Sequence, residues 1–263
     1  MAPWQDQLAG LAKGGPWFGP WREVGEQVAQ ALAQGFLLHQ ALNLHAAGPL
    51  RFVAPAERPS TTAYEQYIFQ TARCPTRDNL HDFFNGLVWL RFPLTKHRLN
   101  RLQAAEIARD GVGGRRGPVR DAITLFDENG ALLDAPPALW AALAARDWRR
   151  LFVDLRPLWE QARVLVFGHA LLEKLLQPRK DITAHVLHVQ CPMAPMAGVD
   201  GWLAGQLTAA RLARKPFTPL PLLGVPGWTA ENQNFSFYDD SQVFRPAARQ
   251  EFRTTAPFAT SST

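Results

Sequence analysis

The clearest pattern of hydrophobic and polar positions lies in residues 75–92, PTRDNLHDFFNGLVWLRF. Its apolar residues fall at i, i+3, i+4, i+7 and i+8, which is one face of a helix: Leu80, Phe83, Phe84, Leu87 and Val88. Three residues spaced four apart share an adjoining face: His81, Asn85 and Trp89. Asp82 follows His81 directly. The pattern predicts a buried helix that carries a polar seam.

Patterns elsewhere predict short elements separated by proline-rich loops. The same periodicity predicts helices over 24–43, 64–72, 94–109, 136–145, 148–153, 158–177 and 200–213, and strands over 50–53 and 181–190. Alternating residues over 121–127 lead into Asn129-Gly130, a favoured tight-turn dipeptide, and predict a β-hairpin. We therefore expect an α+β fold, a mainly helical single domain with a small antiparallel sheet that contains this hairpin.

The chain divides into three parts by composition. Residues 1–49 carry several tryptophans and a helical pattern, and we expect a helical arm packed on the core. Residues 50–246 form the core domain, and the tail 247–263 is expected to be flexible because it ends in small polar residues.

Composition narrows the class of protein. Nine tryptophans and sixteen phenylalanines predict a large aromatic core, and a net charge of +5 permits but does not require an anionic partner. No apolar run approaches the ~20 residues that span a bilayer, and the N-terminus lacks the order of a secretion signal, so we expect no membrane association and a cytoplasmic location. The spacing of Cys74 and Cys191 is not that of a metal-binding or redox motif. The sequence is compatible with two free thiols in a reducing cytosol and with a disulfide between them.

Imidazoles and carboxylates on two predicted helices form the candidate site. His169 and Glu173 are i, i+4 on one side of the predicted helix 158–177, and Gly168 in mid-helix suggests that another backbone or a ligand passes close. The candidate catalytic residues are His81, Asp82, Asn85, Asp121, His169 and Glu173. For a divalent metal ion, the predicted ligands are His81, Asp82 and His169, because such ions bind imidazole and carboxylate groups.

A second candidate feature is the glycine-rich basic stretch 111–120, GVGGRRGPVR. Such a loop can wrap its amides round a phosphate, although it lacks the Lys-Ser/Thr ending of a P-loop and an ordinary surface loop has the same composition. The predicted ligand-binding residues are Trp89, Lys96, Arg115, Arg116 and Arg120.

Several motifs in this order resemble one family. The segments are PTRDNLHDFFNGLVWLRFPLTKHRLN, RDAITLFDENGAL, FGHALLEKLL and LGVPGW…FYDDSQVFRP. Over about residues 50–246 the chain resembles the bacterial domain-of-unknown-function family 3025. The resemblance implies a bacterial cytoplasmic protein and implies no particular activity.

Three hypotheses about function follow. The first is a metal-assisted hydrolase with a His/Asp/Glu site and a basic anion-binding loop. The second is a non-catalytic binder of an anionic small molecule or nucleic acid, whose affinity would fall steeply with salt. The third is a buried polar network in which His81, Asp82, Asn85 and His169 only specify the fold. Convergence of these side chains beside an open cavity would favour the first two.

Overall fold

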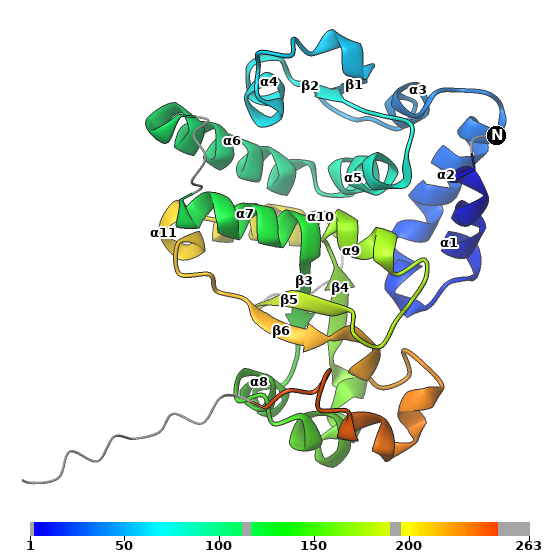
Figure 1. The fold of residues 1–263 in the computed structure, drawn as a ribbon, viewed down its shortest axis with the longest axis vertical. Coiled ribbons are helices and arrows are strands. Elements are labelled where there is room, and N and C mark those ends of the chain that lie inside the picture. The colour runs from blue at the N-terminus through cyan, green and yellow to red at the C-terminus, as the bar shows by residue number, and fades with distance from the viewer. Residues whose placement is uncertain (1–2, 112–116, 190–195, 247–263) are drawn as a thin grey trace, which may run out of the picture.

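The computed structural model describes residues 3–111, 117–189 and 196–246, and most of them lie in short helices around a small sheet (Figure 1). The helices are α1 (Ala9–Lys13), α2 (Arg22–Ala33), α3 (Leu38–Asn43), α4 (Tyr64–Thr71), α5 (Leu80–Arg91), α6 (Pro93–Asp110), α7 (Pro118–Asn129), α8 (Pro137–Ala144), α9 (His169–Lys174), α10 (Met196–Gln206) and α11 (Ala209–Leu212). The strands are β1 (Arg51–Val53), β2 (Arg73–Pro75), β3 (Gly130–Asp134), β4 (Arg163–Val166), β5 (Thr183–His188) and β6 (Thr218–Pro221). Among the described residues, no helix is long and apolar enough to cross a membrane.

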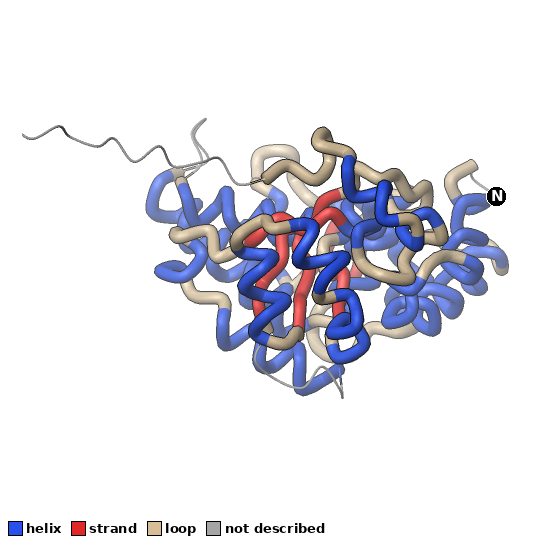
Figure 2. The backbone as a smooth tube through the Cα atoms, turned by 90° about the horizontal axis from the view of Figure 1, so that it is seen from below, coloured by secondary structure: helices blue, strands red, loops and turns tan. Residues whose placement is uncertain are grey.

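The expected fold class is confirmed, a mainly helical α+β domain, but the sheet is mixed rather than antiparallel. Its strand order is β4-β3-β5-β6; β3 pairs antiparallel with β4 and parallel with β5, and β5 pairs antiparallel with β6. Strands β1 and β2 form a separate parallel pair. Seen from below, the four strands lie at the centre of the molecule with helices around them (Figure 2).

The predicted hairpin at Asn129-Gly130 is wrong, because residues 118–129 form the helix α7. Its buried residues Val119, Ala122, Ile123 and Phe126 fall at i, i+3, i+4 and i+7, a helical spacing that the apparent alternation conceals. Gly130 is the first residue of β3, and a Cβ there would lie 2.3 Å from the Phe126 carbonyl oxygen. The glycine thus permits an abrupt change from helix to strand rather than a two-residue turn.

The predicted helix 158–177 is also wrong, since the chain forms β4 and then the short helix α9. The run 163–166 pairs with β3, so its apolar residues are buried by a strand neighbour instead of by a helical face. His169 consequently begins α9 rather than lying in mid-helix. The predicted helix 24–43 is instead two helices, α2 and α3, because Gly35 between them adopts a positive φ of 95°.

The predicted helix within 75–92 is confirmed as α5, and the N-terminal segment packs against it. Phe83, Phe84 and Leu87 have no exposed surface. Phe18 stacks on Phe84 with 6.1 Å between ring centroids, and Trp21 lies 5.8 Å from Phe92. Residues that precede position 50 therefore complete the hydrophobic core over α5.

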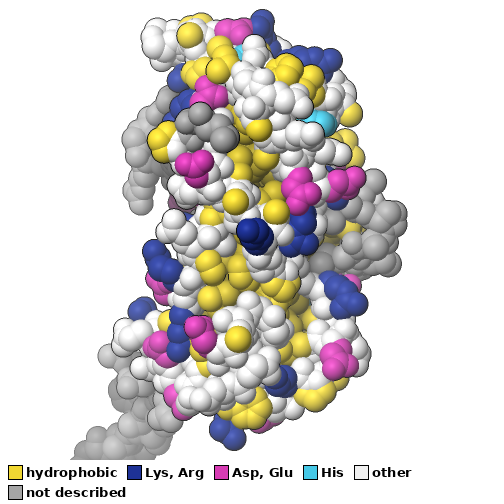
Figure 3. All heavy atoms as spheres, turned by 90° about the vertical axis from the view of Figure 1, so that its right-hand side faces the viewer, with side chains coloured by type: hydrophobic (Ala, Val, Ile, Leu, Met, Phe, Trp, Pro, Cys, Tyr) yellow, Lys and Arg dark blue, Asp and Glu magenta, His cyan; other side chains and the backbone are white. Residues whose placement is uncertain are grey.

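Charged side chains of both signs are interspersed among apolar ones on the face that carries α1 and α2 (Figure 3). The described residues of this face do not gather into a single basic patch. They therefore do not form the one-signed surface typical of proteins that bind nucleic acids through phosphate contacts.

Candidate functional site

The start of α5 is fixed by a cap and an ion pair. The Asn79 side chain accepts a hydrogen bond from the Asp82 backbone N–H at 2.7 Å, as a helix N-cap does. The Asp82 carboxylate accepts from the Arg77 backbone N–H at 2.6 Å and from its Nη2 at 2.8 Å. Asp82 therefore anchors the turn before α5, and its oxygens are already engaged.

His81, one residue earlier on α5, meets His169 at the start of α9. Their Nε2 atoms are 3.1 Å apart, and the rings cross at 76°. The other nitrogen of each ring faces a carboxylate. His81 Nδ1 lies 3.3 Å from Glu173 Oε2, and His169 Nδ1 lies 3.8 Å from Asp127 Oδ2.

Glu128, the penultimate residue of α7, completes this cluster. Its Oε2 lies 3.7 Å from His169 Nε2, and one ligand atom from each of His81, Glu128 and His169 lies within 4.8 Å of the others. His169 is buried, whereas the side chains of His81 and Glu128 are 36% and 33% exposed. The three groups thus converge at a spot that solvent can reach.

Burial and neighbouring charges set the protonation of these groups. Burial lowers the pKa of His169 to about 4, so its imidazole is neutral near pH 7. Burial alone would raise the pKa of Asp127, but the charge and hydrogen bonds of Lys96 together with the two nearby histidines outweigh it and hold the pKa below the usual value. Burial raises the pKa of Glu128. A neutral histidine beside carboxylates is the form that binds metal ions.

Lys96 of α6 lies at the centre of a polar network. Its Nζ donates to both Asp127 oxygens at 2.6 and 2.8 Å and to Asn85 Oδ1 at 2.9 Å. Asn85 Nδ2 in turn donates to Tyr64 OH at 3.4 Å, and Tyr64 OH lies 3.2 Å from Cys74 Sγ. Asn85 and Lys96 therefore have their polar atoms bonded within the protein.

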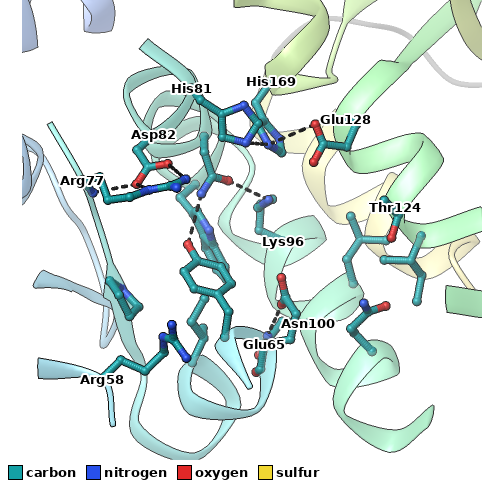
Figure 4. A pocket seen from close by; sticks show the side chains of 18 of the residues that line it. Arg58, Glu65, Arg77, His81, Asp82, Lys96, Asn100, Thr124, Glu128 and His169 are labelled. Atoms are coloured by element: carbon teal, nitrogen blue, oxygen red, sulfur yellow. Dashed lines mark hydrogen bonds and ion pairs between the residues drawn. The ribbon is translucent and has the colours of Figure 1, made fainter. Parts of the chain in front are cut away.

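The cluster opens into a cavity of about 420 Å³ between α4, α5, α6 and α7 (Figure 4). His81, His169 and Glu128 lie at one end, and Arg58, Glu65 and Asn100 lie at the other. A cavity of this size accepts a small molecule.

The comparison with protein-family models gives one match, and it covers most of the chain. Residues 50–248 match the family described as Protein of unknown function (DUF3025). The chain belongs to the DUF3025 family. The comparisons with curated proteins and with solved structures found no match. Every residue of the His81/Glu128/His169 cluster in this DUF3025 chain lies within the matched range.

The other residues predicted for the site are dispersed in this DUF3025 protein. Glu173 contacts His81, and Trp89 is buried in the cavity wall with Lys96 Nζ 5.4 Å from its ring centroid. Asp121 is near the start of α7, 4.0 Å from Lys215 Nζ, and is not among the cavity residues. Arg120 is buried on α7 and does not line the cavity either. Arg115 and Arg116 lie outside the described residues.

Sequence reasoning missed Asp127 and Glu128 because both fall in the segment that was predicted to lead into a hairpin turn at Asn129-Gly130. The signal that could have found them is the helical spacing of the apolar residues before them, which places two acids at the last turn of a helix. It also missed Arg58, in the loop before α4, and Glu65, at the start of α4, because neither belongs to a local motif.

Proposed function

We propose that this DUF3025 protein is a metal-assisted hydrolase, with a divalent metal ion held by His81, Glu128 and His169. One observation carries the proposal: both histidines direct Nε2 to the same place beside Glu128, and each has its Nδ1 facing a carboxylate. Carboxylates behind metal-bound histidines are the usual means of orienting the rings.

The spacing of the two nitrogens supports the proposal. At metal–nitrogen distances near 2.0–2.1 Å, two ligands of a tetrahedral ion lie roughly 3.3 Å apart, close to the observed 3.1 Å. A hydrogen bond between two neutral imidazoles would bring the same atoms equally near. Metal analysis distinguishes the two arrangements.

The residues have separate roles under this proposal. His81, Glu128 and His169 hold the ion, and Glu173 orients the His81 ring through its contact with Nδ1. Asp127 faces His169 Nδ1 at 3.8 Å without a hydrogen bond and supplies negative charge behind that ring, which Lys96 compensates. With three protein ligands, a divalent ion keeps a position for water, lowers the pKa of that water and polarises the bond to be cleaved. Two histidines and one carboxylate also suit iron(II), so the identity of the bound metal is itself a result of the experiment.

The experiment compares the metal content of purified wild-type protein with that of four variants after equilibration with zinc, manganese or iron(II). We expect about one ion per chain in wild type and its loss in His81→Ala and His169→Ala, because each removes one of three ligands. His39→Ala, a histidine of α3 outside the cluster, is the matched control and should keep the metal. Asp82→Asn should also keep it if Glu128 rather than Asp82 is the third ligand.

Hydrolysis of p-nitrophenyl esters and phosphates by the same samples tests the reaction class. Turnover should disappear on chelation and return when the metal is restored. Wild-type protein that is folded by circular dichroism but binds none of the three metals would refute the proposal. A metal-loaded protein that hydrolyses neither group would refute the reaction class alone.

A further inference from the structure

Most charged residues of the cavity form an ion pair or belong to the histidine cluster, and two do neither. Arg77 is paired with Asp82, Lys96 with Asp127, and Glu128 belongs to the histidine cluster. Within the described part of the chain, the cavity residues Arg58 and Glu65 have no ion pair with each other or with any other side chain. One cation and one anion are thus left at the end of the cavity opposite His81 and His169 (Figure 4).

Arg58 retains most of its donors. It is half-buried, and the hydrogen bond recorded for its guanidinium runs from Nη1 to the Thr62 carbonyl oxygen. A guanidinium offers five N–H donors in a planar fork that fits a carboxylate in a bidentate manner.

Glu65 is the complementary acceptor. Asn100 Nδ2 donates to its Oε2 at 2.6 Å and leaves further lone pairs on the carboxylate. Burial raises the pKa of Glu65, and the charge of Lys96 and the hydrogen bond from Asn100 offset this rise only in part. The buried amide oxygen of Gln103, which also lines the cavity, has no hydrogen-bond partner.

We infer that this end of the cavity binds the ammonium and carboxylate groups of an amino-acid-type small molecule. Glu65 and the Gln103 amide accept from the ammonium, and Arg58 donates to the carboxylate. Ile68, Leu99 and Ile123 also line the cavity and offer apolar surface for the aliphatic part of the ligand. The inference rests on the proposed function in one respect only: it assigns the scissile group of the substrate to the His81/Glu128/His169 end.

The test is calorimetric titration with three zwitterionic probes of increasing length, L-glutamine, L-citrulline and Nε-acetyl-L-lysine. For the probe that binds best, the N-acetyl and methyl-ester derivatives remove the ammonium and the carboxylate one at a time. In wild type each derivative should bind about tenfold more weakly or worse, because each loses a charge-assisted hydrogen bond. Glu65→Gln should abolish the penalty for N-acetylation, and Arg58→Gln should abolish the penalty for esterification.

Arg179→Gln, which removes an exposed arginine outside the cavity, is the matched control and should bind all probes as wild type does. The inference would be overturned if no zwitterionic probe showed saturable binding at millimolar concentration. It would also be overturned if N-acetylation and esterification weakened binding to the same extent in wild type and in both cavity variants. Metal content is measured on the same samples. A protein that binds the probes but no metal ion would refute the proposed function alone. A protein that binds a metal ion but none of the probes would refute this inference alone.

Discussion

Gly168 packs directly on the backbone of Glu128. A Cβ atom on Gly168 would lie 2.4 Å from the Glu128 carbonyl oxygen and 2.6 Å from its carbonyl carbon. The close approach brings the start of α9, which carries His169, against the end of α7, which carries Glu128. The absence of one side chain thus sets the spacing between two of the three clustered residues.

Gly168→Ala should therefore separate α7 from α9. The obstructing atoms are backbone and cannot rotate away, so we expect a loss of stability of about 1–3 kcal/mol from the enforced shift. We also expect metal affinity to fall in the folded variant, because His169 and Glu128 move apart. Gly201→Ala, with no atom near the added Cβ, is the matched control. Wild-type stability and metal affinity in Gly168→Ala would show that the helices are not held by this contact.

The sequence predicted one half of this site better than the other. The helical spacing in 75–92 placed His81 correctly on a buried helix. Gly168 was expected in the middle of a helix and instead precedes α9, although another backbone does pass close to it as expected. The sequence could not place Glu128, because the alternating letters of 121–127 hid a helical face and Asn129-Gly130 imitated a hairpin turn. The strand begins only at Gly130, where β3 pairs with β4 on one side and β5 on the other. Such pairing between distant segments is a tertiary contact that local sequence patterns do not encode.

The ion pairs between residues far apart in the sequence could not be predicted from local patterns either. Asp82 was expected to be a metal ligand because divalent ions bind carboxylates, yet its oxygens are engaged by Arg77. Lys96 was expected to bind a ligand, yet its ammonium is bonded to Asp127, 31 residues away. Which partner each charge takes depends on the fold as a whole.

The pair of Lys96 and Asp127 yields a second prediction. The Lys96 side chain is 6% exposed and that of Asp127 is 19% exposed, so removal of either partner leaves the other charge poorly solvated. Lys96→Met should lower the free energy of unfolding by about 3–5 kcal/mol. The double variant Lys96→Met/Asp127→Leu should lose less than the sum of the single losses, measured by urea denaturation. Additive losses would mean that the two side chains do not interact.

Trp21 yields a third prediction, concerning the segment before the matched family range. Its side chain has no exposed surface, and its Nε1 donates to the Val166 carbonyl oxygen of β4 at 3.1 Å. Trp21→Ala should lower the free energy of unfolding by about 3–5 kcal/mol, because it leaves a large cavity and an unpaired carbonyl. The half-buried Trp202 is the matched control, and Trp202→Ala should cost clearly less. A similar small loss in both variants would mean that residues 1–49 are not part of the cooperative core.

The thiol of Cys74 makes stability depend on alkaline pH. Burial raises the pKa of Cys74 to about 12, against about 8.5 for a thiol in an unfolded chain. Between these values the unfolded chain loses the proton first, so ionisation favours unfolding and stability falls as pH rises. The slope attributable to this group approaches about 1.4 kcal/mol per pH unit.

Cys74→Ala removes this effect, and the ionisation of the lysines and of every tyrosine except Tyr64 is common to both proteins. Because the Tyr64 hydroxyl bonds to Cys74, the comparison ends at about pH 10, near the ordinary pKa of tyrosine. We expect the free energy of unfolding of wild type to fall more steeply than that of Cys74→Ala from about pH 8 to about pH 10, and the two slopes to agree below about pH 7, where the thiol is protonated in both states. Denaturant titrations at each pH measure the two slopes. Parallel curves over the alkaline range would show that Cys74 ionises in the folded protein as readily as in the unfolded chain, and hence that the Tyr64 end of the network is open to water.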